Sequence, residues 1–99
     1  MQPQIPIDQA KLETFCRKWK ITELSLFGSV LREDFGPESD VDVLVEFEPG
    51  HTPGLRFFRM EEELSELLGR KVDLNTPAFL SPYFRQEVLN EAEALYVAT

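Results

Sequence analysis

Residues 26–47, with the sequence LFGSVLREDFGPESDVDVLVEF, decide the fold of this chain. They end in the run VDVLVEF over residues 41–47, in which every second residue is a Val or a Phe. Such alternation predicts a β-strand, and Leu44 on the second face predicts a central strand that is covered on both sides beyond its first residues. Asp40 and Asp42 stand one residue apart where this strand begins.

Length and composition limit the classes of function. The 99 residues predict one domain over residues 1–99. The net charge of −8, from 10 basic and 18 acidic residues, argues against direct binding to nucleic acid, which relies on Lys and Arg against phosphates. Cys16 is the only cysteine, so we expect no internal disulfide and a cytoplasmic protein. We expect no secretory signal and no membrane span, because no apolar run has the necessary length.

Hydrophobic periodicity predicts the order helix, strand, short helical turn, strand, helix, strand, helix. The predicted helices cover residues 8–19, with Asp8 as N-cap, residues 55–68, ended by Gly69, and a last segment that begins with Ser81 as N-cap. That last helix is expected to place Phe84, Val88, Ala92 and Leu95 on one face. The second helix is expected to carry an apolar stripe of Leu55, Phe58, Met60, Leu64, Leu67 and Leu68.

The predicted strands cover residues 22–28, 41–47 and 71–76. The second and third are joined through a helix, which predicts parallel pairing, whereas the short link between the first and second predicts antiparallel pairing. The fold class is therefore α/β (α+β), with a small mixed sheet backed by helices.

Three aspartates are candidate metal ligands. Asp40 and Asp42 are at positions i and i+2 of an extended segment, so their side chains point to the same face. Like charges this close favour a bound cation, and Mg²⁺ is a hard ion that takes carboxylate oxygens. Asp73 lies near the start of the parallel neighbouring strand, so it is expected at the same edge of the sheet as a base or a further metal ligand.

A phosphate-binding turn is predicted at the end of the first strand. Gly28 allows a backbone to approach a ligand closely, and Ser29 adds a hydroxyl at the start of a short helix with free N–H groups. Arg32, one turn later, is within reach of a phosphate. Taken alone, Ser29 fits an ordinary N-cap, and Arg32 equally fits a surface ion pair.

The segment GSVLREDFGPESDVD fits the pattern G-S-x(10)-D-x-D of the DNA polymerase β-like nucleotidyltransferase superfamily. Within that superfamily the chain resembles the minimal nucleotidyltransferases (MNT), which are the antitoxins of HEPN/MNT toxin–antitoxin pairs. The resemblance covers roughly residues 24–97 and includes VEFEPG, LLGRKVDLNTP and FRQEVLNEAEALY.

The resemblance implies the polymerase β-like palm fold and Mg²⁺-dependent transfer of AMP from ATP to a tyrosine hydroxyl of a cognate HEPN ribonuclease toxin. It assigns nucleotide binding to Gly28 and Ser29, metal binding to Asp40 and Asp42, and the third carboxylate and base to Asp73. Glu33 departs from the small residue, often Gly, of many relatives, and an acidic group there is expected to weaken nucleotide binding.

Two other functions remain open from the sequence. An antitoxin of this kind can also mask its toxin by direct binding, without catalysis. A nucleotidyltransferase acting on a small molecule normally needs an additional domain to hold the acceptor. One domain of this length leaves no room for it, so a partner protein would have to supply that domain.

Overall fold

The computed structural model describes residues 7–31, 36 and 39–98. Its elements follow in the order α1 (Gln9–Lys18), β1 (Ile21–Phe27), η1 (Gly28–Leu31), β2 (Val41–Phe47), η2 (Gly54–Arg56), α2 (Phe57–Leu68), β3 (Val72–Asn75), η3 (Pro77–Phe79), α3 (Arg85–Glu91) and β4 (Glu93–Val97), where η marks a short 3-10 helix. Asp8 caps α1 by accepting a hydrogen bond from the Lys11 N–H, and Gly69 ends α2 in the left-handed conformation.

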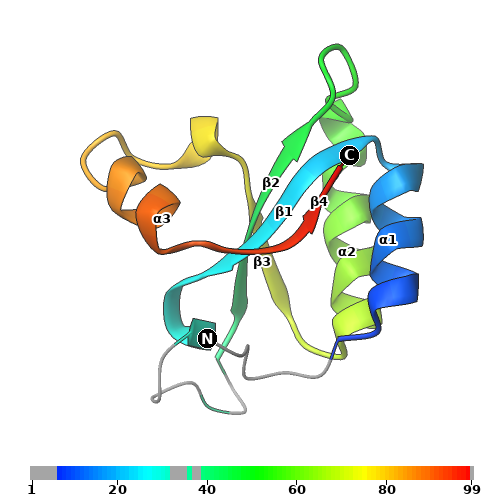
Figure 1. The fold of residues 1–99 in the computed structure, drawn as a ribbon, viewed down its shortest axis with the longest axis horizontal. Helices are drawn as coiled ribbons and strands as arrows, with labels where there is room; N and C mark the ends of the chain where they lie inside the picture. Colours follow the sequence, from blue (N-terminus) through cyan, green and yellow to red (C-terminus); the bar gives the residue numbers. More distant parts are fainter. Residues whose placement is uncertain (1–6, 32–35, 37–38, 99) are drawn as a thin grey trace.

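The four strands form one sheet in the order β3-β2-β1-β4 (Figure 1). β1 pairs with β2 and with β4 in antiparallel fashion, and β2 pairs with β3 in parallel fashion. The predicted mixed sheet, and the direction of both predicted strand pairs, are therefore confirmed.

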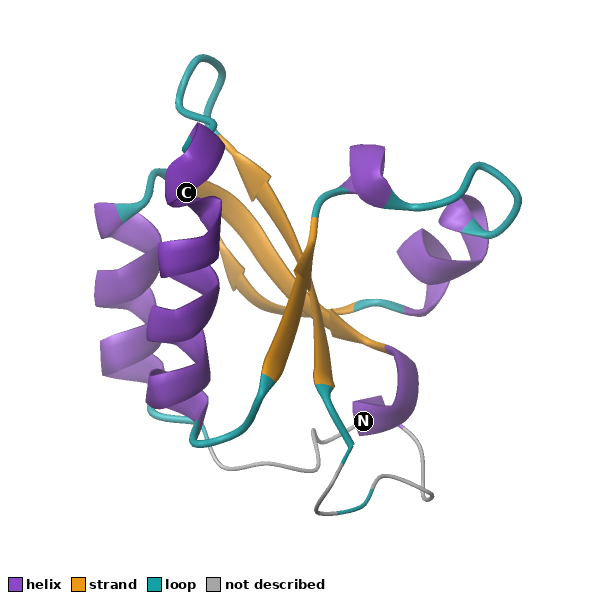
Figure 2. Cartoon of the chain, turned by 180° about the vertical axis from the view of Figure 1, so that it is seen from behind, coloured by secondary structure: helices purple, strands orange, loops and turns teal. Residues whose placement is uncertain are grey.

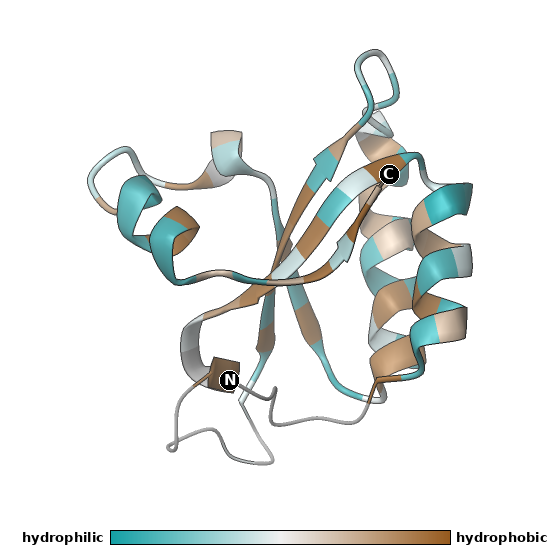
Figure 3. Ribbon diagram, in the orientation of Figure 1, coloured by the Kyte–Doolittle hydropathy of each residue, from teal (hydrophilic) through white to brown (hydrophobic). Residues whose placement is uncertain are grey.

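The two faces of the sheet are covered differently. α1 and α2 lie side by side on one face, whereas α3 and η3 lie on the other (Figures 1 and 2). The helix-covered face holds the main core, and apolar residues gather between the helices and the sheet (Figure 3). Fully buried members of this core include Leu12, Cys16, Leu24, Leu26, Val43, Val45, Met60 and Leu64. A smaller cluster of Phe27, Leu44, Leu80 and Val88 covers part of the opposite face, which we call the open face.

The predicted last helix is wrong at both ends. The observed α3 begins at Arg85 after Phe84, and not after Ser81 as N-cap. Instead of continuing to Leu95, α3 ends at Glu91, and Ala92 turns the chain into extended backbone. β4 follows and pairs with β1. The spacing of Val88, Ala92 and Leu95 suits a helix, but pairing β4 with β1 supplies the backbone hydrogen bonds that β1 would otherwise expose at the sheet edge.

The apolar face of the second helix was also predicted only in part. Leu55 lies in η2 and is 90% exposed, and Phe58 is 67% exposed. The buried side of α2 consists of Met60, Leu64 and Leu68, which are spaced four residues apart. Leu55 and Phe58 are therefore not part of the core.

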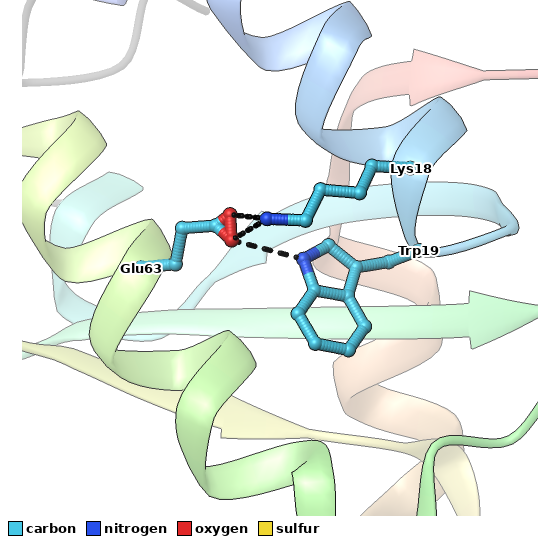
Figure 4. Close-up of polar contacts among 3 residues, drawn as sticks. All are labelled: Lys18, Trp19 and Glu63. Carbon is cyan, nitrogen blue, oxygen red and sulfur yellow. Dashed lines mark hydrogen bonds and ion pairs between the residues drawn. The ribbon is translucent and has the colours of Figure 1, made fainter.

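A polar contact joins α1 to α2 (Figure 4). Lys18 Nζ donates to both carboxylate oxygens of Glu63 at 2.7 and 2.8 Å, and Trp19 Nε1 donates to Glu63 Oε1 at 3.2 Å. The Arg56 guanidinium and the Lys18 ammonium both lie over the Trp19 ring, 5.2 and 5.4 Å from its centre. One carboxylate thus fixes the end of α1 against the middle of α2.

Candidate functional site

The register of three strands brings the candidate residues together. Phe27 of β1 lies opposite Asp42 of β2, and Asp42 lies opposite Asp73 of β3. The neighbours of Asp42 and Asp73 along their strands are buried core residues on the helix-covered face. Because side chains alternate along a strand, both aspartates point to the open face. Two carboxylates from adjacent strands therefore stand next to each other where β2 and β3 begin.

Asp40 lies just before β2 and is exposed. The loop before it is fixed by Arg70, whose guanidinium donates to the carbonyl oxygens of Gly36 at 2.6 Å and Ser39 at 3.0 Å. The Val41 N–H donates to the Lys71 carbonyl at 2.9 Å, which sets the start of the parallel pair. Arg70 thus positions the segment that carries Asp40.

Gly28 is the residue at which β1 meets the acidic pair. Its φ of 74° lies in the left-handed region that favours glycine. A Cβ atom built on Gly28 would overlap the carboxylate of Asp42. Only glycine therefore allows the backbone to lie this close to Asp42 without displacing either group. Ser29 follows within η1, while Arg32 and Glu33 lie outside the described residues.

Glu91 is a site residue that sequence reasoning missed. Its Oε1 accepts a hydrogen bond of 3.1 Å from the Gly28 N–H. The contact exists because α3 ends at Glu91 and β4 then runs beside β1, with Glu93 opposite Leu26. A helix continuing through Leu95 would have left Glu91 as one more acidic residue on a solvated face, so no local signal marks it.

The donor set suits a hard cation. Within the part of the chain that the structure describes, no three His, Cys, Asp or Glu side chains are gathered closely enough to hold a metal ion. The structure thus brings Asp42 and Asp73 together but does not gather all three aspartates into a preformed cage. Mg²⁺ typically uses one or two carboxylates and takes its other ligands from water and phosphate oxygens. The pair of carboxylates beside the Gly28 backbone fits that manner of binding.

Neither a membrane-spanning helix nor a reactive cysteine contributes to this site in the described part of the chain. Among the described helices, none is both long enough and apolar enough to cross a membrane. The Cys16 thiol is buried in the main core, where burial raises its pKa to about 12, so it is an inert core group.

Comparisons with known proteins show the family to which the chain belongs. The nucleotidyltransferase domain model matches residues 9–95. A Methanocaldococcus jannaschii relative named as a protein adenylyltransferase is 42% identical over 82 residues, which is 81% of this chain and 80% of the relative. The protein adenylyltransferase MntA of Thermococcus cleftensis is 39% identical over 75 residues, 75% of this chain and 74% of the relative.

The chain also has the fold of one chain in a solved toxin–antitoxin complex. The structure of the tri-AMPylated Shewanella oneidensis HEPN toxin with its MNT antitoxin superposes with a TM-score of 0.63 at 22% identity, over 91% of this chain and 70% of the matched chain. With a family model that spans most of its residues, and curated relatives of this identity, the protein belongs to the nucleotidyltransferase domain family, where it is similar to the protein adenylyltransferases.

Proposed function

We propose that this protein transfers AMP from ATP, with Mg²⁺, to a tyrosine hydroxyl of a HEPN ribonuclease toxin in the cytoplasm, and so neutralises that toxin. The observation that carries the proposal is the register of Asp42 with Asp73, next to the Gly28 backbone, where a Cβ atom would overlap the Asp42 carboxylate. The acceptor class is supported by relatives named as protein adenylyltransferases and by the AMPylated HEPN toxin in the solved complex.

Each site residue has a proposed role. The backbone of Gly28 and Ser29 binds phosphate oxygens of ATP, and Arg32 adds a positive charge to them. Asp40, Asp42 and Asp73 hold Mg²⁺ through carboxylate oxygens. Mg²⁺ bound there supplies neutralisation of phosphate charge at the reacting α-phosphate.

The transfer is a displacement at phosphorus. The tyrosine oxygen forms a bond to the α-phosphorus of ATP while the bond from that phosphorus to the bridging oxygen of pyrophosphate breaks. Asp73, exposed on the open face, accepts the hydroxyl proton, and pyrophosphate leaves with the bonding electrons. The products are AMP-tyrosine on the toxin and free pyrophosphate.

Intact-protein mass spectrometry tests this proposal. The purified toxin is incubated with this protein, ATP and Mg²⁺, and the expected result is a mass gain of whole AMP units. The Asp40→Asn/Asp42→Asn double variant is expected to abolish that gain, as is chelation of Mg²⁺ with EDTA. Asp8→Asn is the matched control, because it also removes a carboxylate but keeps a residue that caps α1 equally well.

The competing function gives a different pattern. If this protein only masks the toxin, a stable complex forms without any change of mass, and the Asp40→Asn/Asp42→Asn variant neutralises the toxin as well as the unaltered protein does. That result would overturn the enzymatic proposal.

A further inference from the structure

A groove opens where β2 outlasts β3. The last paired residues of the two strands are Leu44 and Asn75, and β2 continues for three more residues to Phe47. A cavity of about 900 Å³ lies at this place. It is bounded by the end of β2, the start of α2 and the segment that follows β3, and we call it the β2-edge groove.

Within the described chain, the wall of the groove formed by β2 presents backbone groups that no neighbouring strand pairs. The Val41 N–H donates to the backbone carbonyl of Lys71 on the β3 side, and the Glu48 N–H donates to the backbone carbonyl of Lys20 on the β1 side. Since backbone groups alternate in direction along a strand, Val45 and Phe47 direct theirs toward β3. If the parallel hydrogen bonding continued, the Val45 carbonyl would accept a hydrogen bond from the N–H of residue 77. Residue 77 is a proline, which has no N–H. In the described chain no strand continues the ladder beyond Asn75, so the Val45 carbonyl and both backbone groups of Phe47 face the groove.

The side chains of the groove are of two kinds. Apolar surface comes from Phe57, Phe58, Leu74, Pro77 and Ala78, and Phe58 is 67% exposed. The charged groups that line the groove are all carboxylates, namely Glu46, Glu48, Glu61 and Asp73. An extended segment that carries both apolar and basic side chains complements this combination of apolar floor, acidic rim and open strand edge.

One lining residue also belongs to the candidate site. Asp73 lines the groove and stands opposite Asp42 on the open face. A segment that occupies the groove therefore lies next to Asp42 and Asp73. It approaches them on the side away from Gly28, because β2 separates β3 from β1 in the sheet.

We propose that the β2-edge groove binds a short, extended, basic segment of the toxin as an added strand beside β2, and that this segment carries the acceptor tyrosine toward Asp73. The inference deepens the proposed function and rests on it for the identity of the partner. The backbone of Val45 and Phe47 gives affinity, the apolar floor takes alternate side chains, and the carboxylates select for Lys and Arg.

The experiment compares two charge-reversal variants. Glu46→Lys/Glu48→Lys changes the rim of the groove. Glu62→Lys/Glu66→Lys makes the same change of net charge on exposed residues of α2 that do not line it. Toxin binding without ATP, and the KM values for toxin and for ATP in AMP transfer, are measured for both. The groove variant is expected to bind the toxin about tenfold or more weakly, with the KM for ATP unchanged, while the control stays close to the unaltered protein.

Hydrogen exchange supplies a readout of the strand addition itself. Binding of the toxin is expected to slow exchange of the Phe47 amide, whose N–H faces the groove. Absence of protection at Phe47 in a saturated complex overturns the added strand.

Each other result has a definite meaning. If both variants bind the toxin equally well, or if the groove variant instead raises the KM for ATP, the groove is not the toxin site and the inference fails. It also fails if the unaltered protein self-associates in solution through this groove and only the groove variant is monomeric. An unaltered protein that transfers no AMP contradicts the proposed function, and the toxin-binding and exchange measurements then decide the groove independently.

Discussion

Gly28 occupies a left-handed backbone conformation directly against the carboxylate of Asp42. We predict that Gly28→Ala lowers the free energy of unfolding by about 1–3 kcal/mol, since the alanine is strained by its φ and its Cβ displaces Asp42. We also predict loss of ATP binding, measured by calorimetry with Mg²⁺ present. Gly50→Ala is the matched control, because Gly50 has a φ of 81° but open space around it. It should lose stability through strain alone and should leave the binding of ATP unchanged. ATP binding by Gly28→Ala at the unaltered affinity would show that the close approach of Gly28 to Asp42 has no role in the site.

Glu91 places a carboxylate on the same backbone N–H that the proposed function assigns to a phosphate. We predict that Glu91→Gln binds ATP about three- to tenfold more tightly, because a neutral side chain removes like-charge repulsion toward the triphosphate. Glu87→Gln, one turn earlier on α3, removes the same charge from an exposed position and should leave the affinity unchanged. Weaker ATP binding by Glu91→Gln would mean instead that Glu91 supports the conformation of Gly28 that ATP needs.

The candidate site was predictable to the extent that it depends on strand register. Asp42 and Asp73 follow from two strands with clear alternation and a helical crossover between them, and Gly28 follows from the turn after β1. Glu91 was not predictable, because it reaches Gly28 only through the end of α3 and the pairing of β4. Its position depends on contacts between residues more than sixty positions apart, which no local pattern records.

At the scale of elements, the packing of α1 on α2 depends on Glu63 (Figure 4). We predict that Glu63→Ala lowers the free energy of unfolding by about 1–2 kcal/mol, because it removes the acceptor of both Lys18 and Trp19. Lys18→Ala should cost less than about 1 kcal/mol, since it breaks a largely exposed ion pair and an exposed cation–π contact with Trp19. Trp19 is the single tryptophan, so urea unfolding followed by its fluorescence measures both variants. Equal losses for the two variants would show that the Trp19 hydrogen bond contributes nothing.

The helix α1 also holds the Cys16 thiol inside the core. Burial raises the pKa of this thiol from 9.0 to about 12, so its neutral form is favoured in the folded protein. The contribution of this thiol to the free energy of unfolding is fully present below pH 9 and is lost as the pH rises toward 12. We predict no reaction of Cys16 with a thiol reagent at pH 8 in the folded protein and rapid reaction in urea.

The alkaline part of this prediction has its own control. Cys16→Ala should be less stable at neutral pH because of the cavity it leaves, but its stability should fall less between pH 9 and 11 than that of the unaltered protein. A parallel fall in both proteins would assign the alkaline loss to other groups.

The elements themselves were predicted unequally. β2 was predicted with its observed bounds, because alternation of apolar residues over seven positions has no competing helical interpretation. The C-terminal segment was misjudged, since Val88, Ala92 and Leu95 fit the helical repeat while the open edge of β1 decides the outcome. Phe58 was misjudged for another reason. Its helical spacing says that one face is apolar, but not that the sheet extends far enough to cover it.

At the scale of the whole molecule, the net charge of −8 spread over 99 residues produces repulsion within the folded state. We predict that raising NaCl from low concentration to about 0.5 M increases the melting temperature, because exposed charges are screened. The Glu62→Lys/Glu66→Lys variant, whose two reversals bring the net charge to −4, should show a smaller increase. An equal increase in both proteins would point to a general salt effect on apolar burial rather than to screening.

The pairing of Asp42 with Asp73 has a further consequence for how the chain reaches its native fold. If β3 slipped by one residue along β2, each of its side chains would point to the opposite face of the sheet. Asp73 would then take the place of Val72 or Leu74, against the buried side of α2. A charged group there, among Met60 and Leu64, is strongly disfavoured. Asp73 thus also disfavours the misfolded sheet in which β3 is shifted by one residue. Replacing it with an apolar residue would disable the site and would also make the shifted register more accessible during folding.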